Sequence, residues 1–199
     1  MRTIWIVVLI FSVLPLRVYA GEPTEEVKKT VDGVINILKD ERLKSPQNMS
    51  KRRRLLKELI YKRFDFEEMS KRSLGIHWAR RSPDERKEFV PLFSDLLERS
   101  YIKKIESYSD EKIIYVDESI DNGYAVVKTK VISKDNVETP IDYRLMRKDS
   151  EWLVYDVVIE GVSLVNNYRT QFNKIITSES YEALIKRMKA KQEEEKALE

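Results

Sequence analysis

The stretch WLVYDVVIEGVSLVNNYRTQF, from Trp152 to Phe172, decides the fold. Its first half is an almost unbroken apolar run, rich in β-branched and aromatic residues, which predicts a strand. Apolar residues fall on both faces of this strand: Leu153, Tyr155, Val157 and Ile159 on one, and Trp152, Val154 and Val158 on the other. A strand with one wet face would alternate, so we expect both faces of this one to be covered.

After Gly161 the apolar spacing changes from that of a strand to that of a helix, with the stripe Val165, Tyr168, Phe172 and Ile175. Asp156 is the single polar break in the strand, and its ionisation is costly without a partner. We predict a structural polar pair between Asp156 and Arg169 that fixes the bend between strand and helix. The alternative is catalytic, because Asp156 with Tyr155 or Tyr143 could form an acid–base pair.

Three more strand patterns come before this one, and short turn sequences such as Asp121-Asn122-Gly123 separate them. Consecutive strands joined by such turns form an antiparallel meander. The inward residues of two strands alternate cleanly with polar ones, as at Ile141, Tyr143 and Leu145. The four predicted strands cover 112–118, 124–133, 139–147 and 152–160.

Helical patterns occupy the chain before these strands. Ser82, Pro83 and Glu85 form a strong helix start, and Pro91 should kink or divide the long helix that follows. Helices gathered on one face of an antiparallel sheet make an α+β domain. We therefore predict a single α+β domain over 21–188 and a charged, frayed tail over 189–199. The predicted helices before the sheet cover 24–40, 50–61, 65–75 and 82–106, and one more covers 180–188 after it.

The first twenty residues resemble a secretion signal. Arg2 supplies the positive charge, an apolar run from Ile4 to Leu14 follows, and Ala20 is the small residue expected before the cleavage site. The apolar run is shorter than the roughly 20 residues that a membrane-spanning helix needs. We therefore expect a cleaved signal peptide over 1–20 and export to the periplasm.

Cysteine is absent, which excludes disulfides and thiolate metal sites. The 37 basic and 34 acidic residues nearly balance, but the window 51–81 holds eleven Lys or Arg against four Asp or Glu. Solvated helix faces explain this basic window most simply, and docking on anionic lipid or an acidic partner is the alternative. Export and the lack of interleaved aromatic residues argue against nucleic acid as a partner.

His77 is the only histidine. A packing role is the simplest interpretation, and a general base or a metal ligand is the alternative. The chain has only five glycines and lacks a phosphate loop, a dinucleotide-binding turn and a nucleophile elbow. The sequence therefore predicts no enzyme, no cofactor and no metal site.

Two blocks of the chain resemble the MlaC family, the periplasmic phospholipid-binding components of lipid-trafficking ABC systems that are also called toluene-tolerance auxiliary proteins. The first begins at Phe64-Asp65-Phe66 and continues as LGIHWARRSPDERKEFVPLFSDLLERSY to Tyr101. The second is YDVVIEGVSLVNNYRTQF, which ends at Phe172. The family commonly has an aromatic pair after Leu-Gly, where this chain has Ile76-His77-Trp78.

The resemblance implies a soluble phospholipid carrier with a cystatin-like, cone-shaped sheet whose pocket takes the acyl chains and leaves the head group exposed. It also implies an inner-membrane ABC transporter complex and an outer-membrane lipoprotein complex as partners. Three alternatives stay open: another lipid cargo such as a hopanoid, a cone-fold isomerase or hydratase that uses Asp156, or a protein-binding adaptor that uses the basic window and holds no ligand. The predicted lipid-binding residues are Phe89, Phe93, Leu97, Tyr101, Val127, Val131, Tyr143, Leu145, Val154, Leu164, Tyr168 and Phe172.

Overall fold

The computed structural model describes residues 22–196, and the predicted signal peptide lies outside this range. The helices of the described chain agree in number and order with the sequence patterns, with end points shifted by a few residues. None of these described helices is both long and apolar enough to cross a membrane. The α-helices are α1 (Glu22–Lys39), α2 (Met49–Arg63), α3 (Phe66–Leu74), α4 (Pro83–Glu106), α5 (Leu164–Ser178) and α6 (Tyr181–Lys196), and the 3₁₀ turns are η1 (Glu41–Leu43), η2 (Pro46–Asn48) and η3 (Gly75–Arg80).

The sheet is an antiparallel meander in the order β1-β2-β3-β4-β5, so each strand pairs with its neighbour in the chain. The prediction of four strands is wrong by one, because Glu160 and Gly161 both take positive φ angles, 50° and 80°, and fold the chain back tightly. A two-residue strand therefore follows before α5 begins. The strands are β1 (Lys112–Asp121), β2 (Tyr124–Ile132), β3 (Glu138–Lys148), β4 (Glu151–Ile159) and β5 (Val162–Ser163).

Strand β4 is buried on both faces, as its sequence predicts. The predicted assignment of residues to the two faces is wrong, however, because the register with β3 shifts between Leu145–Val154 and Arg144–Asp156. An extra residue at Tyr155 makes a β-bulge, and a one-residue insertion exchanges the faces of everything beyond it. Val154 and Val157 consequently share the inner face.

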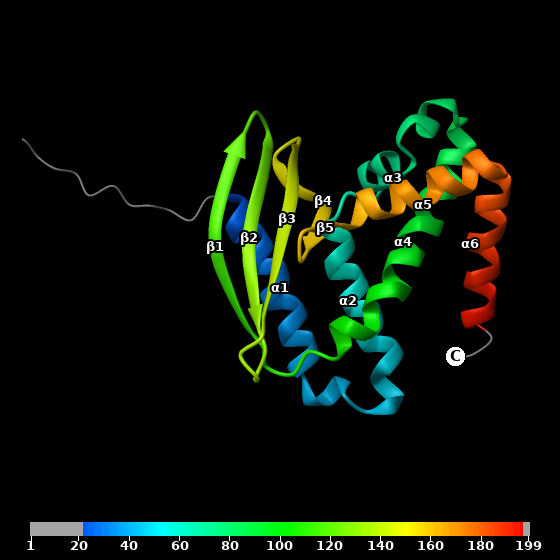
Figure 1. Ribbon diagram of the computed structural model, residues 1–199. Helices are drawn as coiled ribbons and strands as arrows, with labels where there is room; N and C mark the ends of the chain where they lie inside the picture. The colour runs from blue at the N-terminus through cyan, green and yellow to red at the C-terminus, as the bar shows by residue number, and fades with distance from the viewer. Residues whose placement is uncertain (1–21, 197–199) are drawn as a thin grey trace, which may run out of the picture.

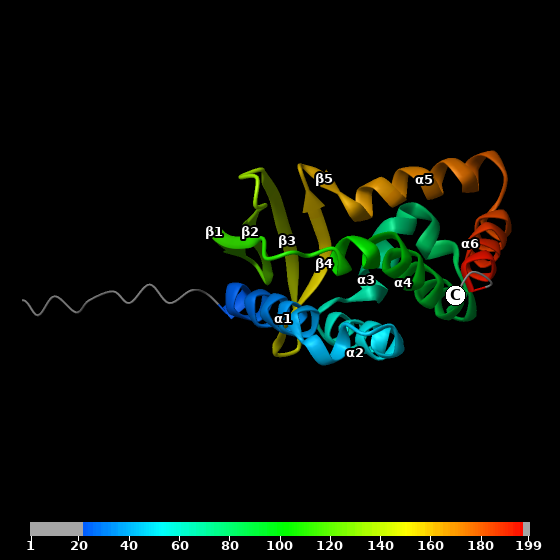
Figure 2. The same cartoon turned by 90° about the horizontal axis from the view of Figure 1, so that it is seen from below.

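Figures 1 and 2 show the sheet at one end of the molecule and helices α3, α5 and α6 at the other. Helix α1 packs against β1, β2 and β4, and α2 packs beside α1. The long α4 extends from the cluster of helices toward the sheet (Figure 1). Helices covering an antiparallel sheet confirm the α+β class.

Helix α4 begins with the predicted capping box, in which Ser82 accepts from the backbone of Glu85 and the Glu85 carboxylate accepts from the backbone of Ser82. Pro91 lies inside the helix but does not divide it. At the other end of the chain, α6 continues to Lys196, so residues 189–196 of the predicted frayed tail are helical.

The buried apolar residues form two groups. The helical core joins α3, α4, α5 and α6 through side chains such as Phe89, Phe93, Phe172 and Leu184. The sheet core joins α1 to the inner face of the sheet through residues such as Val27, Val127, Leu145 and Val154. Members of both groups, such as Leu97 and Val154, also border a cavity between the sheet and the helices.

Candidate functional site: an apolar cavity between the sheet and three helices

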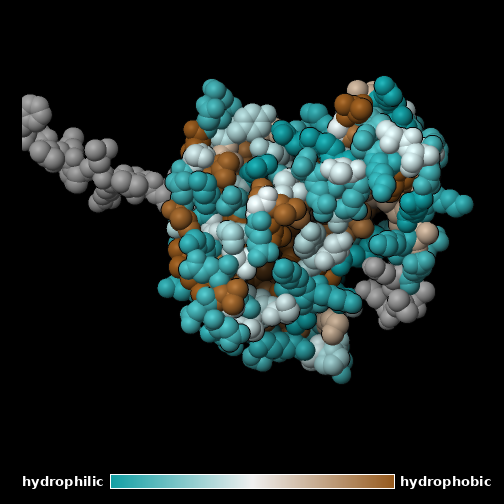
Figure 3. Space-filling model, in the orientation of Figure 1, coloured by the Kyte–Doolittle hydropathy of each residue, from teal (hydrophilic) through white to brown (hydrophobic). Residues whose placement is uncertain are grey.

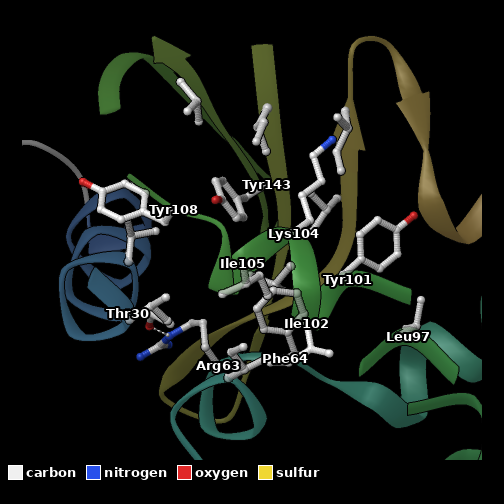
Figure 4. Close-up of a pocket in the computed structure, with 18 of the residues that line it drawn as sticks. Thr30, Arg63, Phe64, Leu97, Tyr101, Ile102, Lys104, Ile105, Tyr108 and Tyr143 are labelled. Carbon is white, nitrogen blue, oxygen red and sulfur yellow. Dashed lines mark hydrogen bonds between the residues drawn. The ribbon is translucent and has the colours of Figure 1, made fainter. Parts of the chain in front are cut away.

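A cavity of about 500 Å³ lies between the sheet and helices α1, α2 and α4. Figure 3 shows apolar side chains gathered in the middle of the face seen there, and Figure 4 shows part of the cavity lining. Pockets for small molecules commonly measure about 300–1,000 Å³ and are mostly apolar. This cavity is therefore large enough for a ligand of that class.

Helix α1 forms one wall. Its apolar residues recur at helical spacing, so they lie on a single face. Val27 at one end and Leu38 at the other are buried, and Val31, Val34 and Ile35 between them are only partly covered because they face the cavity. The side chains of α1 that line it are Val27, Thr30, Val31, Val34, Ile35 and Leu38.

The second half of α4 forms the opposite wall. The first half of the helix buries Phe89 and Phe93 in the helical core, and from Leu97 onward the same apolar stripe turns to the cavity. Figure 4 shows Leu97, Tyr101, Ile102 and Ile105 along this wall.

The sheet closes the cavity with its inner face. Ile141 and Tyr143 come from β3, and Val154 and Val157 come from β4. The β-bulge at Tyr155 is what brings these two valines to one face. Without it, the apolar surface of β4 would be split between the two sides of the sheet.

Half of the twelve predicted lining residues line this cavity, and the other half lie elsewhere. The six that line it are Leu97, Tyr101, Val131, Tyr143, Val154 and Leu164. The six that do not are Phe89, Phe93, Val127, Leu145, Tyr168 and Phe172.

The aromatic residues that were predicted to line the cavity, but do not, fill the helical core instead. Phe93 packs edge-on against Tyr168 and Phe172, with ring centroids 5.3 and 5.6 Å apart, and Phe89 stacks on Phe93 at 5.8 Å. Such geometry leaves no room for a ligand. Val127 and Leu145 are fully buried beneath α1, which places them behind the cavity lining.

The lining that the sequence did not predict comes from α1, α2, the last turns of α4 and the strands. The α1 stripe is visible in the sequence, but it looks like an ordinary core-facing helix. Its distinguishing property is partial exposure of apolar side chains, which only the structure reveals. The unpredicted apolar lining includes Ile60, Tyr61, Phe64, Phe66, Ile102, Ile105, Tyr108, Ile113, Val137, Ile141, Val157 and Ile159.

The tyrosine hydroxyl groups of the lining are held neutral. Burial raises the pKa of Tyr143 to about 12. Burial and the nearby Tyr168 raise the pKa of Tyr101, and burial also raises that of Tyr108. These phenols therefore stay protonated at neutral pH, so the inner surface carries hydroxyl groups but no phenolate charge.

The basic window 51–81 contributes ion pairs that connect the helices around the cavity. Arg52 contacts Glu106 at 3.0 Å, and Lys57 contacts Glu98 at 2.6 Å, so α2 is tied to α4. Further pairs within or from the window are Arg53–Glu106, Arg54–Glu58, Arg63–Glu26, Lys71–Glu68, Arg72–Glu68 and Arg81–Glu85. Much of its charge is thus matched within the protein.

Asp156 lies outside the cavity and is 3% exposed. The predicted partner, Arg169, is wrong. The carboxylate accepts from Arg144 Nη1 at 3.2 Å, Ser163 Oγ at 2.7 Å and the Val165 backbone N–H at 3.1 Å. Ser163 is the N-cap of α5, so Asp156 ties β3 and β4 to the start of that helix.

Arg169 stabilises a different junction. Its Nε donates to the backbone carbonyl of Arg72 at 2.7 Å, near the end of α3. A Cβ on Gly75 would stand 3.4 Å from Arg169 Cδ, and Gly75 has a φ of 53° that favours glycine. Arg169 lies about one and a half turns into α5, and its guanidinium is bound at the end of α3 rather than at Asp156.

His77 lies in η3 and is buried, and its Nε2 stands 2.9 Å from Asn173 Oδ1. It does not line the cavity. Over the described part of the chain, no cluster of three or more His, Cys, Asp or Glu residues could hold a metal ion. The surroundings of His77 agree with a packing role.

Comparison with known proteins identifies the family to which the chain belongs. Residues 28–190 match the family described as "MlaC protein". The chain is 24% identical over 183 residues to the intermembrane phospholipid transport system binding protein MlaC of Haemophilus influenzae, covering 89% of this chain and 86% of that one. It is also 24% identical over 169 residues to a toluene tolerance protein of Pseudomonas putida, covering 84% of this chain and 79% of the relative.

Among solved structures, the fold is similar to that of a phospholipid-binding protein from Ralstonia solanacearum, which was determined in complex with a phospholipid. The TM-score is 0.77 at 24% identity, and the alignment covers 85% of this chain and 96% of the other.

Proposed function

The chain belongs to the MlaC family, and we propose that it is a soluble periplasmic carrier of phospholipid. In this proposal the acyl chains enter the apolar cavity and the head group stays at its opening. The observation that carries it is the cavity of about 500 Å³, lined by apolar side chains from the sheet, α1, α2 and α4. The phospholipid in the related Ralstonia solanacearum structure supports the same class of ligand.

The energetics explain why such a cavity is useful. Each methylene group removed from water contributes about 0.8 kcal/mol, so a sixteen-carbon tail crossing water unshielded would cost roughly 12 kcal/mol. The lining residues provide an apolar surface without requiring the protein to unfold. A carrier built this way avoids that cost by keeping the tail out of water, and it leaves the charged head group hydrated.

The proposed partners follow from the family. The relative in Haemophilus influenzae is the binding protein of an intermembrane phospholipid transport system. We accordingly assign to this protein an inner-membrane ABC transporter complex and an outer-membrane lipoprotein complex as the donor and acceptor of lipid. Export through the predicted signal peptide, cleaved after Ala20, places it between them.

Three other functions were compatible with the sequence, and one of them, a protein-binding adaptor, would hold no ligand. An isomerase or hydratase based on Asp156 is disfavoured by geometry, because this carboxylate lies outside the cavity and is bound by three protein groups. A carrier of another lipid, such as a hopanoid, needs the same kind of apolar lining. Extraction of the purified protein with organic solvent, followed by mass spectrometry, distinguishes these cargoes.

The test of the proposal is lipid rebinding after delipidation. The wild-type protein should rebind phospholipid stoichiometrically, and Val131→Trp should block uptake because Val131 lines the cavity. The matched control is Val126→Trp on the same strand, where alternation points the side chain to the opposite face. Protein from cells that carries no lipid and takes up none on reconstitution contradicts the proposal.

A further inference from the structure

Five charged side chains line the cavity, and four of them have partners within the protein. Lys57 pairs with Glu98 at 2.6 Å. Arg63 is bound by Glu26, Thr30 and the Trp152 carbonyl. The Glu111 carboxylate accepts from the backbone and the hydroxyl of Ser109.

Lys104 is the exception. Its side chain makes no hydrogen bond or ion pair with any other described residue, although it lines the cavity. It is also exposed, so it lies where the cavity meets solvent. Figure 4 shows it extending from α4 toward the strands, between Tyr143 and Tyr101.

Lys104 places a positive charge at the edge of an apolar surface, and a lipid-binding protein can use both. The apolar walls bind tails of any lipid and therefore distinguish poorly between head groups. A single ammonium group at the boundary of an apolar surface attracts an anion more strongly than it would in bulk water, because the local dielectric constant is lower. Lysine binds phosphate as such a point charge.

We infer that Lys104 binds the phosphodiester of the lipid head group at the opening of the cavity and thereby selects phosphate-bearing lipids over neutral lipids with the same tails. The inference rests on the proposed carrier function and adds the group that recognises the head. The tails supply most of the affinity, and Lys104 sets which lipid is preferred and which end faces the solvent.

A second explanation for a lysine at this position is the helix dipole. Lys103 and Lys104 both lie in the last turn of α4, where a positive charge stabilises the helix. Lys103 is also exposed but does not line the cavity. It is the matched control, since its removal changes the dipole term and the net charge by the same amount.

The experiment offers delipidated protein an equimolar mixture of phosphatidylglycerol and diacylglycerol with identical acyl chains, in micelles of a nonionic detergent. Native mass spectrometry then gives the ratio of the two lipids bound. Wild type should prefer phosphatidylglycerol. Lys104→Ala should lower that ratio about tenfold, a typical loss for one charge-assisted contact, and its uptake of diacylglycerol offered alone should equal that of wild type. Lys103→Ala should keep the wild-type ratio, and Lys104→Arg should largely restore it.

Salt provides an independent readout. The preference of the wild type for phosphatidylglycerol should fall as ionic strength rises, because exposed charges are screened, and the ratio for Lys104→Ala should not change. Equal ratios for wild type and Lys104→Ala, with both lipids still bound, would overturn the inference and leave the carrier function intact. Wild type that binds neither lipid would overturn both. Circular dichroism confirms that each variant is folded.

Discussion

The two halves of helix α4 are equally apolar but serve opposite purposes. In the first half, Phe89 and Phe93 are completely buried by aromatic rings from α5. In the second half, Tyr101, Ile102 and Ile105 remain partly exposed and face an open cavity. One continuous stripe therefore supports a solid core at one end and a hollow at the other.

The difference shows that an apolar sequence pattern predicts burial away from water, but not whether protein side chains or a ligand cover the apolar surface. Rings that meet edge to face fill space, because their shapes interlock. Aliphatic side chains on α1, α4 and the sheet stand too far apart to do so. We propose that the lipid takes the place of the missing neighbours, which makes the cargo part of the apolar interior.

The largest expected effect on stability comes from shortening a side chain in the first, fully buried half of α4. Phe93→Ala should destabilise the protein by about 3–5 kcal/mol, because the cavity it leaves is surrounded by rings that cannot collapse into it. Denaturant unfolding measures this value. The matched variant on the hollow half is Ile102→Ala, which should cost only about 1 kcal/mol because its side chain already borders open space. Similar losses for the two variants would contradict the distinction.

A smaller effect is expected where the sheet joins the helical half. Asp156→Asn weakens the contacts to Arg144, Ser163 and the Val165 amide, and should cost about 1–3 kcal/mol. Because Asp156 lies outside the cavity, lipid uptake by the folded variant should equal that of wild type. Lost uptake at unchanged stability would argue against a structural role. Arg169→Ala tests the other junction and should leave the Asp156 contacts in place.

The smallest effect concerns pH. The ordinary pKa of tyrosine is about 10, and burial raises that of Tyr143 to about 12. The stability that comes from keeping this phenol neutral is fully present below pH 10 or so and is lost as pH rises toward 12. Tyr143→Phe should therefore lose less stability than wild type over that interval, as measured by denaturant unfolding at each pH.

Bound lipid should change the ionisation of Tyr143, which lines the cavity, but not that of a tyrosine in the helical core. Burial, together with Glu85, raises the pKa of Tyr181 to about 12 as well, but Tyr181 lies in the helical core. Loading with phospholipid should shift the ionisation of Tyr143 to still higher pH and leave that of Tyr181 unchanged. Ultraviolet titration of Tyr143→Phe and Tyr181→Phe, each with and without lipid, measures this. The lipid-dependent shift should become smaller in Tyr143→Phe, where Tyr101 and Tyr108 still line the cavity, and should keep its wild-type size in Tyr181→Phe.

Much of the fold could be predicted because its signals are local. The capping box at Ser82 sets the start of α4, and Asn122-Gly123, with φ angles of 45° and 80°, makes the hairpin between β1 and β2. Clean alternation in β3 gives the correct inner residues, such as Ile141 and Tyr143. Such features depend on neighbours within a few residues.

The candidate site was predicted only in half, because its composition depends on distant contacts. The shift in register at Tyr155 exchanges the faces of the β4 residues that follow it, and no short sequence pattern predicts this shift. Whether Phe93 or Ile102 meets a ligand depends on α5, which lies about 70 residues further along the chain. The partner of Asp156 likewise comes from β3 and from the cap of α5.

The sequence by itself determined the elements, their order, the absence of thiol chemistry and the resemblance to a lipid-binding family, since all of these depend on residue identity and short-range spacing. The tertiary structure decided which apolar surfaces close on each other and which leave a cavity. Hydrophobic burial is non-directional, so a stripe of apolar residues is satisfied equally by a protein core or by an acyl chain. Only the distance between the packed elements separates the two outcomes.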